Sequence, residues 1–346
     1  MRSLLHCAAV AALATVPNLA AARDLTVVSW GGIFQDAQRT VFFAPFAAET
    51  GTALAEDSWE GGVGVLRSKA QGGDANTWDV IEVEGDELEI GCEEGLFEVL
   101  DPAKLGGYEK YLPGTATDCG IPANIYSLVI AYDADKMPEG PKGWADFWDT
   151  TKFPGKRALR NGPKMNLEFA LMADGVAPAD VYSVLSTPEG VDRAFAKLDE
   201  IKGDIVWWTS GNQPMQLLGS GEVAMTTTYH TRVGNSNTSD GTNFKLIYDG
   251  SMFLVDSWVV MKGSPNLEAA YKLLEFMSRP EVQVKWPEQL GGGVGVTEAQ
   301  AMLDPALAAS LPTAEANVSV ALPLDTGFWI ANIDALNTRF ATWSGN

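Results

Sequence analysis

The segment from residue 251 to 282 constrains the fold most, because it joins a buried strand directly to a packed helix. Residues 253–260 are almost all apolar and predict a strand that is buried on both faces. A helix starts after Pro265, with apolar residues at helical spacing, and ends at Pro280. The exception in the strand is Asp256, and a buried carboxylate is costly without a cation or several donors. Asp256 therefore either caps a neighbouring backbone group or meets a ligand.

Strands and helices alternate along most of the chain. Two such rhythms are separated by a turn-rich segment at 136–142, and internal repeats are absent. Strand–helix–strand alternation is typical of parallel sheets, so an α/β fold is expected. At 346 residues the chain is long enough for a core in each half. The strands are predicted at 24–30, 52–57, 78–83, 121–132, 157–160, 204–208, 222–229, 244–248 and 253–260.

Residues suited to binding follow several of these strands. In α/β sheets, ligands bind at the carboxyl ends of the strands, and the glycine pair that begins at Gly31 lets a group approach the backbone. Two tryptophans end the strand at 204–208, and because neighbours alternate faces, we expect one in the core and Trp208 in a cleft. The predicted ligand-binding residues are Trp30, Gly31, Glu84, Asp86, Tyr126, Trp208, Tyr229, Arg232 and Asp256.

These residue types indicate a cationic ligand. Aromatic faces attract ammonium groups, and carboxylates fix such groups by charged hydrogen bonds. Each residue also has an ordinary explanation, because tryptophans often lie in cores and acidic turns are often only solvated. A formal charge of −21 excludes nucleic acid and anionic membranes as expected partners. The chemistry therefore points to a small-molecule amine.

The first residues predict export. Residues 1–22 carry Arg2, an apolar run and small residues before Arg23, which is typical of a cleavable signal peptide. Export leaves Cys92 and Cys119 where disulfides are permitted, and a bond between them would contribute about 3 kcal/mol. Two cysteines with His230 do not make a zinc motif. We expect a soluble periplasmic protein without metal or other cofactor.

Several longer motifs resemble a known family. The residues that carry the resemblance are VSWGG at 28–32, AYDADK at 131–136, WADFWD at 144–149, LLGSGEVAM at 217–225 and VDSWVVMKGSPNLEAA at 255–270. They are similar to periplasmic substrate-binding proteins of ABC importers, in the branch that includes the spermidine/putrescine-binding proteins.

The resemblance implies a two-lobe periplasmic binding protein fold, type II-like. Each lobe is then a mainly parallel sheet flanked by helices, and two segments cross between the lobes. Lobe 1 is predicted to comprise 23–130 and 256–300, and lobe 2 to comprise 131–255 and 301–346. The implied function is to hold a polyamine such as putrescine or spermidine in the cleft and deliver it to an inner-membrane permease. A monomer without catalytic activity is expected.

Three basic residues depart from the pattern of that branch. Lys164 lies near where the family places acidic ligands, and Arg160 and Arg232 add positive charge that a diamine would not favour. A zwitterionic, amino-acid-like or betaine-like ligand is therefore a second hypothesis for the same importer role. A secreted glycan hydrolase with two carboxylates is a third. Iron capture is disfavoured, because paired tyrosines at the expected strand end are absent.

Overall fold

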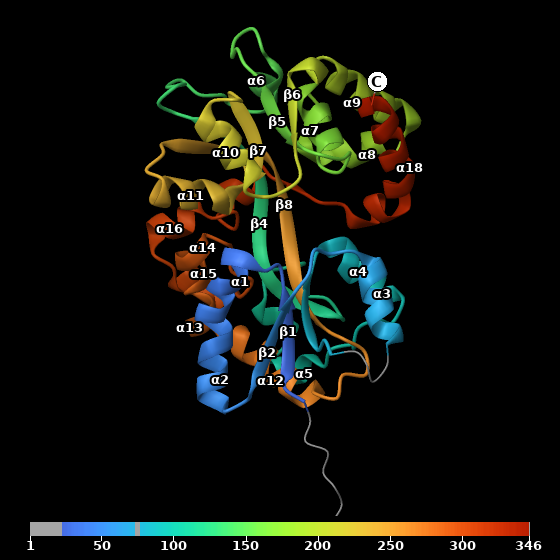
Figure 1. Cartoon of the computed structure of the whole chain (residues 1–346), viewed down its shortest axis with the longest axis vertical. Coiled ribbons are helices and arrows are strands. Elements are labelled where there is room, and N and C mark those ends of the chain that lie inside the picture. Colours follow the sequence, from blue (N-terminus) through green and yellow to red (C-terminus); the bar gives the residue numbers. More distant parts are fainter. Residues whose placement is uncertain (1–22, 73–76, 346) are drawn as a thin grey trace, which may run out of the picture.

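The computed structural model describes residues 23–72 and 77–345, and the predicted signal peptide at 1–22 lies outside them. The described part has two lobes stacked along the long axis of the molecule, with two long strands running through both (Figure 1). These strands are β4 (Gly120–Asp133) and β8 (Phe244–Val260). They are the two crossing segments that the sequence predicts.

The strands of the described residues form one sheet. Its order is β2-β1-β3-β8-β4-β7-β5-β6, with β9 beside β8. Parallel pairs are β1 with β2, β1 with β3, β5 with β6 and β5 with β7, whereas β8 and β4 join the two halves antiparallel. Each lobe thus has a parallel set of strands, as predicted. The remaining strands are β1 (Leu25–Ser29), β2 (Leu54–Ser58), β3 (Val80–Val83), β5 (Arg157–Arg160), β6 (Ile205–Trp208), β7 (Met225–Tyr229) and β9 (Leu322–Pro323).

Helices cover both faces of the sheet in each lobe (Figure 1). Lobe 1 carries α1 (Gly32–Gln38), α2 (Ala44–Thr50), α3 (Val63–Gln71), α4 (Gly85–Glu93), α5 (Pro102–Leu105), α12 (Leu267–Met277), α13 (Pro280–Gln283), α14 (Trp286–Leu290), α15 (Thr297–Met302) and α16 (Pro305–Ser310). Lobe 2 carries α6 (Trp144–Trp148), α7 (Asn166–Ala173), α8 (Val181–Leu185), α9 (Pro188–Asp199), α10 (Gln213–Ser220), α11 (His230–Ser239) and α18 (Thr326–Gly345). A π-helical turn at Arg39–Phe43 joins α1 to α2, and 3-10 turns lie at Tyr108–Lys110, Pro178–Asp180 and Lys202–Asp204.

Each of the two crossing strands contributes side chains to the cores of both lobes. In β4, Ala123 packs in the lobe 1 core and Tyr126 in the lobe 2 core. In β8, Trp258 packs in lobe 1 and Leu254 in lobe 2. Large apolar side chains are buried in three clusters, one in lobe 2 and two in lobe 1, so each lobe has a hydrophobic core of its own. The lobe boundaries given from the sequence remain predictions.

A third connection passes between the lobes. After α16, Leu311 packs in the lobe 1 core, and Leu322 in β9 packs in the lobe 2 core. Between them lies α17 (Glu315–Val318), and β9 pairs in parallel with β8. The segment 311–325 thus adds to the two predicted crossings and brings the chain to α18.

The predicted disulfide is present in lobe 1. Cys92 at the end of α4 is bonded to Cys119 just before β4, with a Cα–Cα distance of 5.8 Å. The bond closes a loop with a sequence separation of 27, for which a loop-entropy estimate gives about 3 kcal/mol. In the described ranges, no helix combines the length and apolarity of a membrane span.

Candidate functional site

A stacked pair of tryptophans lies at the carboxyl ends of the first two strands. The rings of Trp30 and Trp59 are 5.4 Å apart at an interplanar angle of 12°. Gly31 has a positive φ of 67°, which the turn from β1 into α1 requires, and a Cβ there would lie 3.3 Å from Cβ of Ser58. The turns after β1 and β2 are thus packed closely together. This arrangement puts an aromatic surface beside the strand ends.

Two buried carboxyls lie next to this surface. Asp256 and Trp258 share one face of β8, and Trp258 pairs with Glu82 of β3, so the two carboxyls lie diagonally across adjacent strands. Glu82 accepts hydrogen bonds from Ser29 at 2.7 Å and Gln38 at 2.6 Å. Oε1 of Glu82 and Oδ1 of Asp256 are both buried without a hydrogen-bond partner among the described residues. Lobe 1 therefore presents two incompletely paired acids.

The surroundings disfavour the charged form of both acids. Burial raises the pKa of Glu82 to about 7, against the hydrogen bonds from Gln38 and Ser29. Burial also raises the pKa of Asp256 well above its usual value, and the charges of Glu82 and Glu84 raise it further. A cation placed here would reverse both effects by stabilising the charged forms. The pair is therefore suited to an ammonium group.

Further carboxylates surround the start of α4. Glu84 is the N-cap of this helix, and Glu87 reaches back to accept from its backbone N–H at 2.9 Å in a capping box. Glu87 also accepts from the N–H of Gly62 at 2.5 Å, and its burial raises its pKa to about 7. Glu87 thus ties the turn after β2 to α4. Glu84 and Asp86 are half-buried and face lobe 2.

Lobe 2 contributes a basic wall opposite these acids. Nζ of Lys164 lies 3.0 Å from Asp86 and 3.7 Å from Glu84, so an ion pair joins the lobes across the cleft. Burial lowers the pKa of Lys164, but the two carboxylates outweigh it and the net pKa is raised. Arg160 at the end of β5 is also half-buried; interaction with Tyr229 and then with Glu84 raises its pKa. The lobes touch in this arrangement.

Arg160 and Arg232 differ from most arginines of the described part. Arg39 pairs with Glu56 at 2.7 Å, and Arg279 pairs with Glu49 at 2.8 Å. Within 23–72 and 77–345, neither Arg160 nor Arg232 forms an ion pair at bonding distance. Burial lowers the pKa of Arg232, as expected for a cation that lacks a close partner. These two guanidinium groups thus form no ion pair at bonding distance with a carboxylate of the described residues.

Tyrosines lie between the two walls. The rings of Tyr126 and Tyr229 are 5.8 Å apart, and desolvation raises the pKa of both hydroxyls. Trp208 contacts Tyr229 at 5.8 Å but has no exposed surface, and its indole N–H donates to Thr227 at 3.2 Å. Trp207, the other candidate, packs against Phe340 of α18. The expectation that Trp208 is exposed to the cleft is therefore wrong for this arrangement, because Tyr229 covers it.

The structure adds residues that the predicted site lacks. Trp59, Glu82, Arg160 and Lys164 join the predicted residues around the cleft. Trp59 had a usable signal, because a serine, a tryptophan and a glycine pair end both β1 and β2. No sequence signal predicts the pairing of Lys164 with Asp86, because the two residues lie in different lobes and far apart in the chain. Within the described ranges, no group of His, Cys, Asp and Glu could hold a metal ion.

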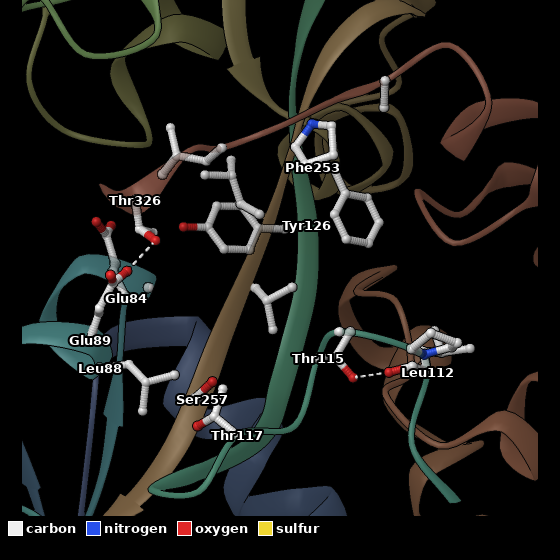
Figure 2. A pocket seen from close by; sticks show the side chains of 18 of the residues that line it. Glu84, Leu88, Glu89, Leu112, Thr115, Thr117, Tyr126, Phe253, Ser257 and Thr326 are labelled. Atoms are coloured by element: carbon white, nitrogen blue, oxygen red, sulfur yellow. Dashed lines mark hydrogen bonds between the residues drawn. The ribbon is translucent and has the colours of Figure 1, made fainter. Parts of the chain in front are cut away.

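A large cavity is lined mainly by residues outside the predicted site. Its volume is about 1100 Å³. Of the predicted ligand-binding residues, only Glu84 and Tyr126 line it, and Figure 2 shows the Tyr126 ring pointing toward Glu84 and Thr326. Neither the tryptophan pair nor the basic wall contributes to it. The two spaces therefore share a wall but differ in chemistry.

Two lobes joined by crossing strands, with a charged and aromatic cleft between them, define a solute-binding protein. The model of the bacterial extracellular solute-binding protein family matches residues 42–315, so the chain belongs to that family. Its relatives are substrate-binding components of ABC transporters and not enzymes, which removes the support for a glycan hydrolase. The chain is accordingly a solute-binding protein of an ABC transporter, in a family that works outside the cytoplasm.

Individual relatives differ in how similar they are to this chain. The γ-aminobutyric acid (GABA)-binding protein of Pseudomonas aeruginosa is 41% identical over 325 residues, which cover 94% of this chain and 92% of the relative. The solved structure of the Atu4243-GABA receptor has a TM-score of 0.83 and 33% identity, covering 93% of this chain and 98% of that one. The spermidine/putrescine-binding periplasmic protein of Escherichia coli is 24% identical over 226 residues, 62% of each chain. The resemblance to the polyamine branch is thus distant.

Proposed function

We propose that the protein captures a linear amino acid, with its amine and carboxylate at opposite ends, and delivers it to an ABC permease. GABA or a close ω-amino acid is the candidate ligand. The observation that carries the proposal is incomplete pairing on both sides: Glu82 and Asp256 of lobe 1 each have a buried oxygen without a hydrogen-bond partner, and Arg160 and Arg232 of lobe 2 form no ion pair at bonding distance with a described residue. A zwitterion supplies one partner to each wall.

In the proposed complex, the ammonium group lies between the tryptophan pair and the carboxyls of Glu82 and Asp256. The carboxylate meets Arg160 and Arg232, whose planar guanidiniums can bind it by two hydrogen bonds each. Tyr126 and Tyr229 cover the carbon chain between them. Similarity to two GABA-binding proteins supports this choice over other amino acids.

A polyamine is the competing ligand that the sequence first suggested. Its second ammonium would have to lie near Lys164, Arg160 or Arg232, where like charges at close range are unfavourable. The acids alone would accept a diamine. The basic wall therefore decides between the two ligand classes.

The test is a calorimetric titration of the purified protein with GABA, with putrescine as the diamine of equal carbon number and with butyrate as the acid. We expect saturable binding of GABA and at least about tenfold weaker binding of the other two, a difference of about 1.4 kcal/mol. Binding of putrescine at least as tightly as GABA would overturn the proposal. Arg232→Gln should abolish the preference, whereas Arg339→Gln on the outside of α18 should leave it intact.

A further inference from the structure

The cavity beside the cleft, which we call the hinge cavity, has the size of a ligand site. Its volume of about 1100 Å³ exceeds the roughly 300–1,000 Å³ of common small-molecule pockets. Phe253, Leu254, Val255 and Ser257 of β8 line it, while Asp256 does not. Because side chains alternate along a strand, three of these four side chains belong to the face of β8 opposite Asp256. The cavity shares Glu84 and Tyr126 with the predicted amino-acid site, and its other lining residues lie outside that site.

The walls of the hinge cavity are apolar. Leu88 of α4, Phe253 and Val255 of β8, and Val318 and Leu324 of the C-terminal crossing segment contribute to them. Figure 2 shows Phe253 and Leu88 on either side of the space, with Tyr126 between them. Apolar walls favour a ligand with a hydrophobic body, since burial stabilises by about 25 cal/mol per Å².

The charges of the lining residues indicate that the ligand also carries a cationic group. Five carboxylates lie among the lining residues, and none of the lining residues is Lys, Arg or His; the carboxylates are Glu84, Glu89, Glu93, Asp118 and Glu315. Glu89 accepts a hydrogen bond from Thr326 at 2.5 Å, and Glu84 lies 3.7 Å from Lys164. Glu93, Asp118 and Glu315 form no ion pair with any described residue. An ammonium group at the rim would have several carboxylate partners, and an anion would be repelled.

We propose that the hinge cavity is a second ligand site, which takes a hydrophobic primary amine and favours the closed arrangement of the lobes. The cavity is bounded by α4 of lobe 1, by the crossing strand β8 and by residues 313–326, most of which belong to the crossing segment 311–325, so its shape depends on how the two lobes are oriented. It is open in an arrangement in which Lys164 joins the lobes through Asp86. A ligand that fits this shape stabilises it relative to others.

The shared wall couples the two sites. Tyr126 and Glu84 line the hinge cavity; the Tyr126 ring also lies 5.8 Å from that of Tyr229, and the Glu84 carboxylate raises the pKa of both Arg160 and Tyr229. An amine in the cavity therefore contacts side chains that also face the amino-acid ligand. Coupling between two binding equilibria is reciprocal, so closure favoured by one ligand raises the affinity for the other.

The probe is 2-phenylethylamine, with 3-phenylpropionate as a control of similar shape and opposite charge. Titration of the purified protein should give saturable binding of the amine, about tenfold or more tighter than that of the acid. Small-angle scattering should show a smaller radius of gyration with the amine than without it. Neither measurement needs GABA, so both stand whether or not GABA is the cleft ligand.

Variants test whether 2-phenylethylamine binds in the hinge cavity. Ala321→Trp puts an indole into the hinge cavity and should abolish amine binding, whereas Ala341→Trp, on the exposed side of α18, should not. The double variant Glu93→Gln, Asp118→Asn leaves the walls unchanged and should weaken amine binding severalfold, which keeps the test valid if the larger side chain prevents folding. Equal binding of amine and acid, amine binding that persists in Ala321→Trp, or an unchanged radius of gyration would overturn the proposal.

Discussion

The two walls of the cleft are built alike but carry opposite charge. In both lobes, the side chains follow the carboxyl ends of parallel strands, Trp30 and Glu84 in lobe 1 and Arg160 in lobe 2. Burial raises the pKa of the lobe 1 acids Glu82 and Asp256, and the lobe 2 residues Arg160 and Arg232 form no ion pair at bonding distance with a described carboxylate. The same architecture can therefore bind a cation or an anion, depending on the residues at the strand ends.

The opposite charges of the two walls also affect how easily the lobes close. An unpaired buried charge is costly, and a partner from the other lobe or from a ligand relieves that cost. Lys164 provides such a partner for Asp86, whereas Glu82, Asp256, Arg160 and Arg232 form no ion pair at bonding distance with any described residue of the other lobe. A zwitterion would pair both walls at once, so its binding and lobe closure should reinforce each other.

Removing the acid of lobe 1 should have the largest effect. Asp256→Asn keeps the size of the side chain but removes the proposed partner of the ammonium group. We expect GABA affinity to fall by about 2–5 kcal/mol, the usual cost of removing one partner of a buried ion pair. Calorimetry measures the loss, and thermal unfolding verifies the fold. Asp334→Asn on exposed α18 is the control; an unchanged affinity in Asp256→Asn would remove Asp256 from the site.

Neutralising the lobe 2 wall should cost somewhat less and should change selectivity. Arg160→Gln and Arg232→Gln each remove a proposed carboxylate partner, so GABA binding should weaken by about 1.5–3 kcal/mol. Putrescine, which has no carboxylate, should bind the variants at least as well as the parent protein. A parallel loss for both ligands would mean that these arginines support the structure and do not contact the carboxylate.

The affinity for GABA should rise with pH. Glu82 and Glu87 have pKa values near 7 when folded, against about 4.5 in the unfolded chain. The stability from their protonated forms is complete below about pH 4.5 and is lost as the pH rises through about 7. An ammonium ligand needs the ionised acids of the cleft, so GABA should bind about tenfold more tightly at pH 8 than at pH 6.

Affinity is the better measure of this effect than stability. His230 accepts from the N–H of Ser127 through Nδ1, and burial lowers its pKa to about 4. Its contribution to stability is present above about pH 6.5 and is lost as the pH falls toward 4, which opposes the contribution of the acids. Binding enthalpies in buffers of different ionisation enthalpy should reveal proton release near pH 6.5. Binding without proton release would contradict an ammonium site on the protonated acids.

The cross-cleft ion pair should have the smallest effect. Lys164→Met frees Asp86 and Glu84 and removes one positive charge from lobe 2, so putrescine affinity should rise about fivefold, or about 1 kcal/mol. Lys197→Met, which breaks an ion pair with Glu200 on the outer surface, is the control. Putrescine affinity that falls in Lys164→Met would show that the lysine does not oppose diamines.

Much of this architecture can be predicted from the sequence. The alternation of strands and helices predicts the parallel pairs, and the apolar run around Asp256 predicts a buried strand with an acid that lacks a simple partner. Strand ends predict that Trp30, Glu84 and Tyr229 lie near one edge of the sheet, because strand direction determines where side chains meet; their role in ligand binding stays a prediction. These predictions depend on local patterns, which the sequence carries directly.

What the sequence does not carry is the direction of turns and the pairing between lobes. Trp207 and Trp208 both end β6, and only the packing of α18 on Trp207 and of Tyr229 on Trp208 shows that neither faces the cleft freely. The lack of partners for Arg160 and Arg232 is likewise a tertiary property, since it depends on which acids of distant segments come near. Polyamine specificity was inferred without that information.

The central claim is that the cleft selects a ligand with both charges. Calorimetric competition between GABA and putrescine on the same protein sample at pH 8 tests it most directly. The account predicts that GABA binds with a one-to-one stoichiometry and that putrescine at about a hundredfold excess displaces little of it. Displacement of GABA by an equal concentration of putrescine would contradict the account, because it would mean that the acids of lobe 1 alone determine what binds.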